Sequence, residues 1–248
     1  MKKIIMFASV CFFSAVTVAA VQPEDTSKGI VTYSAGRVRK QPRNFNMWQS
    51  APRNTEIFSG DKVRTYTRSR AELDLAELDI IRLAPQTTID ILKLYEETKD
   101  KVLETQLSVE EGEIWANVHE VKMNTKIDIS TPVSAAAITG TVLRLSVERD
   151  STTRLKVYEG EVKITNAPEN KKLTPKGVVP YEIEPPHEIP GPVEVSVEEW
   201  LYIVKEMQQI TIDNKGKVVS KGRFRAVDND EKTAWVIWNR KRDTLRQK

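Results

Sequence analysis

Alternation of apolar and polar residues dominates residues 29–166 and constrains the fold more than any other feature of the sequence. In the segment RAELDLA, the apolar residues Ala71, Leu73 and Leu75 fall on one side and the charged residues on the other, which is typical of a half-buried strand. Runs of the same kind occur in VLETQLSV, IDIS, VLRLSV and LKVYEGEVKI. Together these runs predict roughly ten short strands and therefore a mainly β unit over residues 29–166.

Glycines recur within this alternation, each one to three residues ahead of a β-branched position. They are Gly36, Gly60, Gly112, Gly140 and Gly160. A glycine inside a strand pattern usually marks a bulge, a sharp corner or a close approach of two backbones. The spacing of these glycines is irregular, so we expect corners between coils of unequal length, in a β-solenoid or a twisted sandwich of short strands.

The composition changes after Asn166. Residues 175–192 hold six of the twelve prolines, which favours an extended path over a helix or a central strand. We therefore expect a Pro-rich linker or strap over residues 167–195. A C-terminal segment of two helices with a hairpin between them is expected over residues 196–248.

The first of these helices is predicted from SVEEWLYIVKEMQQ, which opens with a capping box formed by Ser196 and Glu199. Its apolar residues recur at helical spacing; they are Val197, Trp200, Leu201, Val204 and Met207. A hairpin is expected around Asn214 to Gly216. The second helix is predicted at the end of the chain, with Ala234, Trp238 and Leu245 on one side.

The first twenty residues have the form of a secretory signal, with Lys2 and Lys3 followed by an apolar run that ends at Ala20. We expect a signal peptide over residues 1–20, cleaved after Ala20, and hence a secreted or periplasmic protein. An uncleaved membrane anchor is the alternative, since the run approaches the roughly twenty residues that a span needs. Once the signal is removed, no stable membrane span is expected.

Cysteine content and charge exclude several classes of protein. The only cysteine, Cys11, lies in the apolar run, so the mature chain cannot form an internal disulfide. Removal of residues 1–20 leaves 36 basic and 35 acidic residues, a balance that does not indicate a nucleic-acid partner.

No catalytic or metal-binding constellation is visible in the sequence. His119 and His187 are the only histidines, and the clustered ligands that zinc or iron would need are missing. No phosphate loop, serine elbow or His-Glu-x-x-His motif occurs. We therefore expect no enzyme activity, no metal and no cofactor.

Tryptophan offers the better candidates for interaction. Tryptophan is enriched in binding patches, and the chain has five. Trp115 lies opposite the apolar face of its strand, so it should point outward or into an interface. Trp235 and Trp238 in the terminal helix are further interaction candidates, although docking of the helix on the β unit would also explain a tryptophan there.

Several segments together resemble a known family. SGDKVRTYTRSRAELDL, IIRLAPQTTIDI, VEEGEIWANV, IDISTPVSAAAITGTVLRLSV and LKVYEGEVKITN occur in the order seen in the FecR-like domain of bacterial envelope proteins. The resemblance spans about residues 29–166. The positions that carry it as structural motif residues are Gly60, Asp61, Arg64, Thr65, Gly112, Thr131, Pro132, Gly140, Thr141 and Gly160.

The resemblance implies a mainly β, solenoid-like, non-enzymatic envelope domain. In founding members of the family the domain belongs to a regulator that also has a cytoplasmic anti-sigma part and a membrane helix, and it relays a signal from an outer-membrane receptor. Only Met1 to Lys3 precede the apolar run here, so we expect a free-standing chain without those parts. Residues 76–79 and Thr139 depart from the family pattern, in a turn and beside the Gly140-Thr141 pair.

The function expected from the sequence is a non-enzymatic scaffold or protein-interaction module of the envelope, with an envelope protein as partner. Recognition of peptidoglycan or another envelope polysaccharide through outward aromatic residues is the alternative. A signalling component that acts with an envelope receptor is a more distant one.

Overall fold

The computed structural model describes residues 28–75, 79–98, 101, 103–118, 125–166 and 200–246. The expected signal peptide, the Pro-rich strap and both histidines lie outside these residues, as do residues 76–78 of the turn that departs from the family pattern.

Strands make up most of the described chain, and one α-helix follows them. The elements are β1 (Gly29–Ala35), β2 (Val38–Gln41), β3 (Gln49–Ser50), β4 (Glu56–Ile57), β5 (Lys62–Thr65), β6 (Arg70–Leu75), β7 (Asp79–Leu83), β8 (Thr88–Glu97), β9 (Leu103–Asn117), β10 (Thr125–Ser130), β11 (Ala135–Val147), β12 (Thr153–Thr165), β13 (Leu201–Lys205), β14 (Gln208–Ile212), β15 (Val218–Arg223), a short 3-10 helix η1 (Asn229–Lys232) and α1 (Ala234–Arg246). The expectation of a mainly β fold is confirmed.

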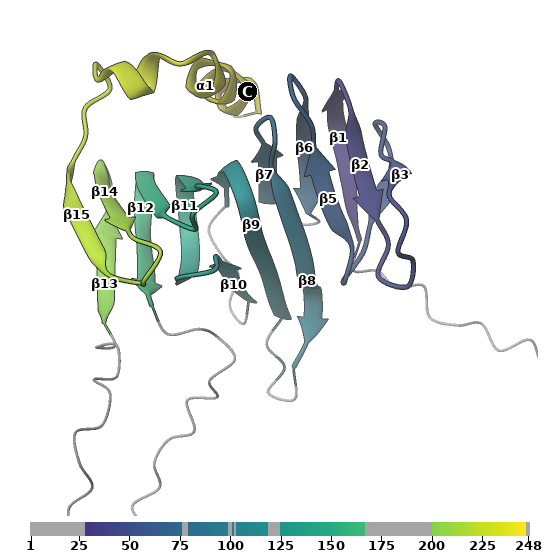
Figure 1. Ribbon diagram of the computed structural model, residues 1–248, viewed down its shortest axis with the longest axis horizontal. Helices are drawn as coiled ribbons and strands as arrows, with labels where there is room; N and C mark the ends of the chain where they lie inside the picture. Colours follow the sequence, from purple (N-terminus) through teal and green to yellow (C-terminus); the bar gives the residue numbers. More distant parts are fainter. Residues whose placement is uncertain are drawn as a thin grey trace, which may run out of the picture.

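All the described strands belong to one open mixed sheet (Figure 1). Its pairing follows two rows. The first row runs β4-β1-β6-β7-β9-β11-β12-β14-β15. The second row runs β3-β2-β5-β8-β9-β10-β11-β12-β13. The long strands β9, β11 and β12 take part in both rows, one half in each.

The glycines stand where the chain passes from one row to the other. Gly112, Gly140 and Gly160 lie inside β9, β11 and β12, with φ values of 102°, 60° and 80°. Gly36 and Gly60 separate β1 from β2 and β4 from β5, with φ values of 72° and 84°. Residues other than glycine rarely adopt a positive φ, so these are the corners that the sequence predicts.

The inward faces of the two rows share one core. Its cluster of buried residues combines Leu73 and Leu145 of the first row with Val63 and Val162 of the second. Because the polar residues that alternate with these face away from the core, burial reproduces the period-two pattern of the sequence. The two rows thus share one core within a single open mixed sheet.

The predicted helix over residues 196–209 is wrong in its described part. Residues 201–205 form β13, which pairs with the second half of β12, and β14 follows almost at once. Tyr202, Ile203 and Val204 favour a strand by side-chain type, and the exposed edge of β12 offers backbone partners. Sheet extension therefore overrides the helical spacing. Trp200 contacts the core from this segment, and its indole nitrogen donates to the Gly216 carbonyl at 2.8 Å.

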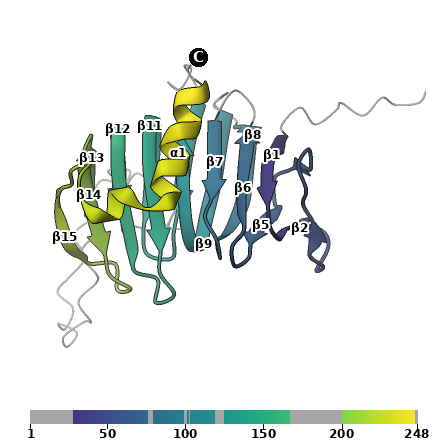
Figure 2. The ribbon, with the colours of Figure 1, turned by 90° about the horizontal axis from the view of Figure 1, so that it is seen from above.

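The hairpin around residues 214–216 and the terminal helix are confirmed as β14-β15 and α1. The face of the helix is predicted wrongly, because Ala234 and Leu245 are exposed whereas Trp235, Val236 and Asn239 are buried. Figure 2 shows α1 lying across the outer face of the first row.

Candidate functional site: the helix-covered face of the sheet

The site beneath α1 is a line of large polar and aromatic residues that crosses five strands of the first row. Strand register places Glu72 opposite Arg82, Arg82 opposite Trp115, Trp115 opposite Arg144, and Arg144 opposite Lys156. All five are at most 9% exposed. Charges buried in this way need partners, and α1 with η1 supplies them.

The first group of contacts, the Glu72 cluster, joins Glu72 and Arg82 of the sheet to Arg242 and Asp243 of α1. The Arg82 Nε lies 2.7 Å from Glu72 Oε2, and its Nη1 lies 2.6 Å from Asp243 Oδ1. Arg242 of α1 donates two hydrogen bonds to Glu72, at 2.7 and 2.8 Å. The cluster therefore holds the C-terminal half of α1 on β6 and β7.

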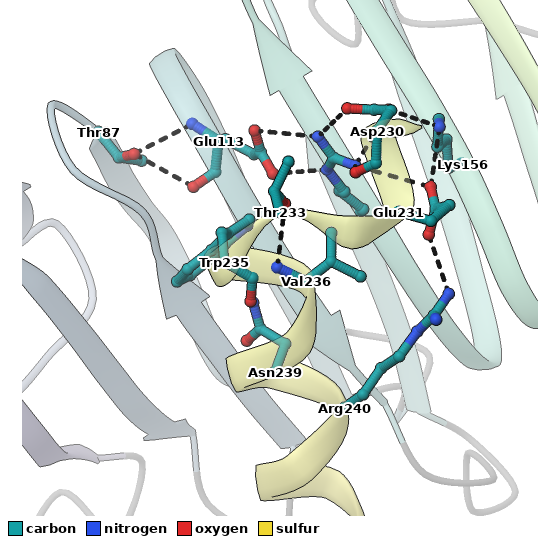
Figure 3. A network of polar contacts seen from close by, with 11 residues as sticks. Thr87, Glu113, Lys156, Asp230, Glu231, Thr233, Trp235, Val236, Asn239 and Arg240 are labelled. Carbon is teal, nitrogen blue, oxygen red and sulfur yellow. Dashed lines mark hydrogen bonds and ion pairs between the residues drawn. The ribbon is translucent and has the colours of Figure 1, made fainter. Parts of the chain in front are cut away.

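A second group holds η1 and α1 on β11 and β12 (Figure 3). This group, the Glu231 cluster, consists of Glu113, Arg144, Lys156, Asp230, Glu231 and Arg240. Arg144 contacts Glu113 at 2.5 Å and Asp230 at 3.0 Å. Lys156 contacts Asp230 at 2.6 Å and Glu231 at 2.9 Å, and Arg240 reaches the other oxygen of Glu231 at 2.9 Å. These contacts satisfy each of the charges buried at this end of the line.

The first turn of α1 is capped beside this cluster. The Thr233 hydroxyl accepts a hydrogen bond from the Val236 amide at 3.3 Å, the position that an N-cap threonine satisfies (Figure 3). The side-chain amide of Asn239 donates from Nδ2 to the Trp235 carbonyl at 2.9 Å. Sequence reasoning misses both clusters because their members look like solvated charges until the strand register and α1 bring them together.

Trp115 lies between the two clusters and is 1% exposed. Its ring stacks on Tyr158 with centroids 4.5 Å apart, and its indole nitrogen donates to Asp243 Oδ2 at 2.9 Å. The sequence predicts that Trp115 points either outward or into an interface, and the structure places it in the interface between α1 and the sheet. A polysaccharide cannot reach Trp115, so the sequence expectation of an outward ligand platform there is wrong.

The other two tryptophan candidates also belong to this interface. Trp235 is 7% exposed and stacks on Trp238 with centroids 5.4 Å apart. Trp238 is partly buried, and the centroid of its ring lies 5.4 Å from that of Tyr33 of β1. Both therefore dock α1 on the sheet.

The electrostatics of the site oppose proton-transfer chemistry. Burial alone would raise the pKa of Glu72, but hydrogen bonds from Arg242, Arg82 and Thr32 outweigh it and lower that pKa to about 2. For Asp230, bonds from Lys156 and Arg144 likewise outweigh burial and lower the pKa to about 2. Burial raises the pKa of Tyr158. Each group thus keeps one protonation state near neutral pH, whereas a general acid or base needs a pKa near the working pH.

An open hollow of about 890 Å³ lies beside the beginning of α1. Charged side chains line it, among them Glu113, Arg144, Arg149, Asp150 and Arg154. Glu113 and Arg144 pair with each other, and Arg149 pairs with Glu111 at 3.3 Å. Within the described ranges, no group of three or more histidine, cysteine, aspartate or glutamate residues could hold a metal ion.

The motif residues expected from the sequence belong to neither cluster beneath α1, and several of them lie at corners and turns. Asp61 accepts hydrogen bonds from the Phe58 and Arg43 amides, at 2.9 and 3.3 Å. Thr65 donates to the Ala84 carbonyl at 2.5 Å, and Thr141 donates to the Glu161 carbonyl at 3.0 Å.

The remaining motif residues lie in one turn and on one strand. Thr131 and Pro132 lie in the turn between β10 and β11, where the Thr131 hydroxyl accepts from the Ser134 amide at 3.0 Å. Arg64 donates to Thr88 on the outer face of the second row at 2.9 Å.

Residues 61–163 match a family model described as FecR protein. The chain contains a FecR domain. No curated protein matches the chain. Two crystal structures of a candidate anti-sigma factor from Parabacteroides distasonis ATCC 8503 are similar to the fold, with TM-scores of 0.46 and 0.45 and 13% sequence identity. The similar region covers 66% of this chain and 60% of each solved chain.

The matched residues of the FecR domain begin just before β5 and end within β12. The sheet continues on both sides of them, through β1–β4 before and β13–β15 after. The contacts beneath α1 therefore join two parts of the chain. The FecR domain supplies Glu72, Arg82 and Arg144, and the C-terminal part supplies α1. No helix in the described part of the chain is long and apolar enough to cross a membrane.

The end of the sheet beyond the FecR domain is open. Among the described strands, β13 pairs only with β12, and β15 pairs only with β14. Leu201 and Ile203 of β13 are 65% and 49% exposed, and Val219 of β15 is 59% exposed. A hollow of about 200 Å³ lies between Ile203 and Arg223.

Proposed function

We propose that this protein is an exported, non-enzymatic scaffold of the bacterial cell envelope that binds a protein partner at the open end of its sheet. The FecR domain and the signal-like sequence of residues 1–20 support the envelope assignment. The ion pairs beneath α1, between Glu72 and Arg82 and between Lys156 and Glu231, support a structural use of this polar site.

The open sheet end is the observation that carries the proposal. Edge strands present unpaired backbone groups, and an extended segment of another protein can add to them as a further strand. Natural edges are usually short or protected by charge, but β13 instead exposes Leu201 and Ile203 on one face. Backbone pairing would supply affinity, and the two apolar side chains would supply selectivity.

A pair of matched double variants tests the proposal. The chain from Val21 onward carries an affinity tag and is incubated with solubilised envelope proteins. Leu201→Ser with Ile203→Ser changes the sheet edge, whereas Val227→Ser with Ile237→Ser changes two residues that are similarly exposed, at 64% and 57%, outside the sheet.

The proposal predicts one enriched envelope protein that the tagged chain and the control variant retain equally. The edge variant should bind that protein at least about tenfold more weakly, because two apolar contacts are lost. Retention by the edge variant, or binding to glycan strands in place of any envelope protein, would contradict the proposal.

A further inference from the structure

The strongest unassigned feature of the molecule is the charge of its other end, formed by β1–β5. Residues 28–70 contain ten lysines and arginines but only two acidic residues, Glu56 and Asp61. Glu56 pairs with Lys28 at 2.6 Å and Asp61 with Lys40 at 2.8 Å. Within the described residues, seven arginines of residues 28–70 have no carboxylate partner; they are Arg37, Arg39, Arg43, Arg53, Arg64, Arg68 and Arg70.

Two of these arginines face each other across the outer face of the second row. Register places Arg39 of β2 opposite Arg64 of β5. Like charges directly opposite each other on neighbouring strands are destabilising, so the Arg39–Arg64 pair has a cost in folding free energy unless an anion neutralises it. An anionic surface beside the pair would remove that cost.

Trp48 lies against this arginine pair. The guanidinium of Arg64 is 4.6 Å from the centre of the Trp48 ring, and Arg39 donates to the Trp48 carbonyl at 3.4 Å. The same basic face continues through a hollow of about 460 Å³ whose lining includes Arg37, Arg39 and Arg53.

The loop that carries Trp48 exposes apolar side chains. Phe45 is 57% exposed and Met47 is 71% exposed, both between β2 and β3. The base of the loop is anchored, because the Arg43 amide donates to Asp61 and the Phe45 amide donates to the Pro42 carbonyl at 3.0 Å. The structure thus combines an ordered loop with apolar tips and a basic surround.

We infer that this end of the molecule, defined by Arg39, Arg64, Phe45, Met47 and Trp48, docks on a membrane surface that contains anionic phospholipids. Basic residues close to such a surface are attracted to its headgroups, and apolar side chains enter the headgroup region. A sugar chain fits less well, because Met47, the more exposed of the two apolar side chains, has no aromatic face on which a sugar ring could stack. This docking is independent of the open sheet end at β13 and β15.

Sedimentation with lipid vesicles tests the inference. The chain from Val21 onward is used, so that the apolar N-terminal run does not contribute to binding. Vesicles of phosphatidylcholine with phosphatidylglycerol should sediment the protein, and vesicles of phosphatidylcholine alone should not. Binding should weaken as the salt concentration rises, because salt screens the attraction.

Paired variants separate the basic and apolar contributions. Arg39→Gln with Arg64→Gln should lower the partition coefficient by about tenfold or more, and Arg39→Lys with Arg64→Lys should restore most of it. Phe45→Ser with Met47→Ser should also lower it severalfold. The control variant, Arg154→Gln with Lys163→Gln, removes two exposed cations of β12 and should leave binding unchanged.

Three results would overturn the inference. One is an absence of sedimentation with the anionic vesicles, including the case in which the protein binds a soluble acidic polysaccharide through the same arginines. Another is binding that Phe45→Ser with Met47→Ser leaves unaltered. The last is an equal loss in the β12 control variant, which would indicate attraction by overall charge.

Discussion

At the scale of single residues, glycine determines where the sheet folds over. Gly160 has a φ of 80°, and a Cβ atom there would lie 2.5 Å from the Gly140 carbonyl oxygen. Gly112 has a φ of 102°, and its Cβ would lie 2.5 Å from Thr87 Cα. The backbone angle and the lack of space both exclude a side chain at these two positions. The glycines are therefore required by corners of the chain and not by contact with a ligand.

Gly160→Ala should lower the free energy of unfolding by more than about 1 kcal/mol, because it adds strain at a positive φ and a clash with backbone. Urea denaturation measures the change. Gly222→Ala is the matched control, since no atom lies within 4 Å of the added Cβ. Equal stabilities for the two variants would refute the corner assignment of Gly160.

The Glu72 carboxylate should make stability depend on pH in acid. Its pKa is lowered from 4.5 to about 2 in the folded protein, so its contribution is complete above about pH 4.5 and is lost as the pH falls toward 2. Glu72→Gln should reduce stability at pH 7 by up to about 3 kcal/mol and flatten the decline between pH 4.5 and pH 2.

Denaturation curves recorded over this pH range check the prediction. Glu159→Gln, at an exposed position of β12, is the control and should follow the parent protein. If the Glu72→Gln and parent curves stay parallel down to pH 2, the ion pairs with Arg82 and Arg242 do not stabilise the fold as described.

At the scale of elements, α1 is held to the sheet by contacts that converge on a few side chains. Asp243 accepts from Arg82 and from the Trp115 indole. Asp243→Asn should therefore lower the free energy of unfolding by about 1–3 kcal/mol, because it removes the charge that pairs with a buried guanidinium. Lys241→Gln changes an exposed neighbour and should have little effect.

Hydrogen exchange locates the effect of this substitution. Amides of α1 should exchange faster in Asp243→Asn, and those of β14 should change less, because local opening follows the weakened element. Uniformly faster exchange across the sheet would show that α1 does not open independently of the sheet.

The elements differ in how well the sequence predicts them. The strands β6, β9, β10, β11 and β12 follow from alternation, and α1 follows from its charge pattern, since both signals are local. β13 does not, because Leu201 and Val204 also suit a helix and only the free edge of β12 decides between the two. Contacts with a distant strand leave no trace in a short window of sequence.

At the scale of the whole molecule, the sheet has two different ends on either side of a helix-covered middle (Figure 2). The basic end carries Phe45 and Met47, and the open end carries Leu201 and Ile203. Sequence analysis predicts the family and the fold class, but the line from Glu72 to Lys156 could not be predicted. It depends on the register of five strands and on which residues of α1 face the sheet.

The central claim, that the open end of the sheet binds a protein partner, is tested most directly by site-specific photo-crosslinking in intact cells. A photoreactive residue replaces Ile203 in one strain and Val227 in another. The account predicts one discrete crosslinked protein from position 203 and none from position 227. No product from position 203, or the same product from both positions, would contradict it.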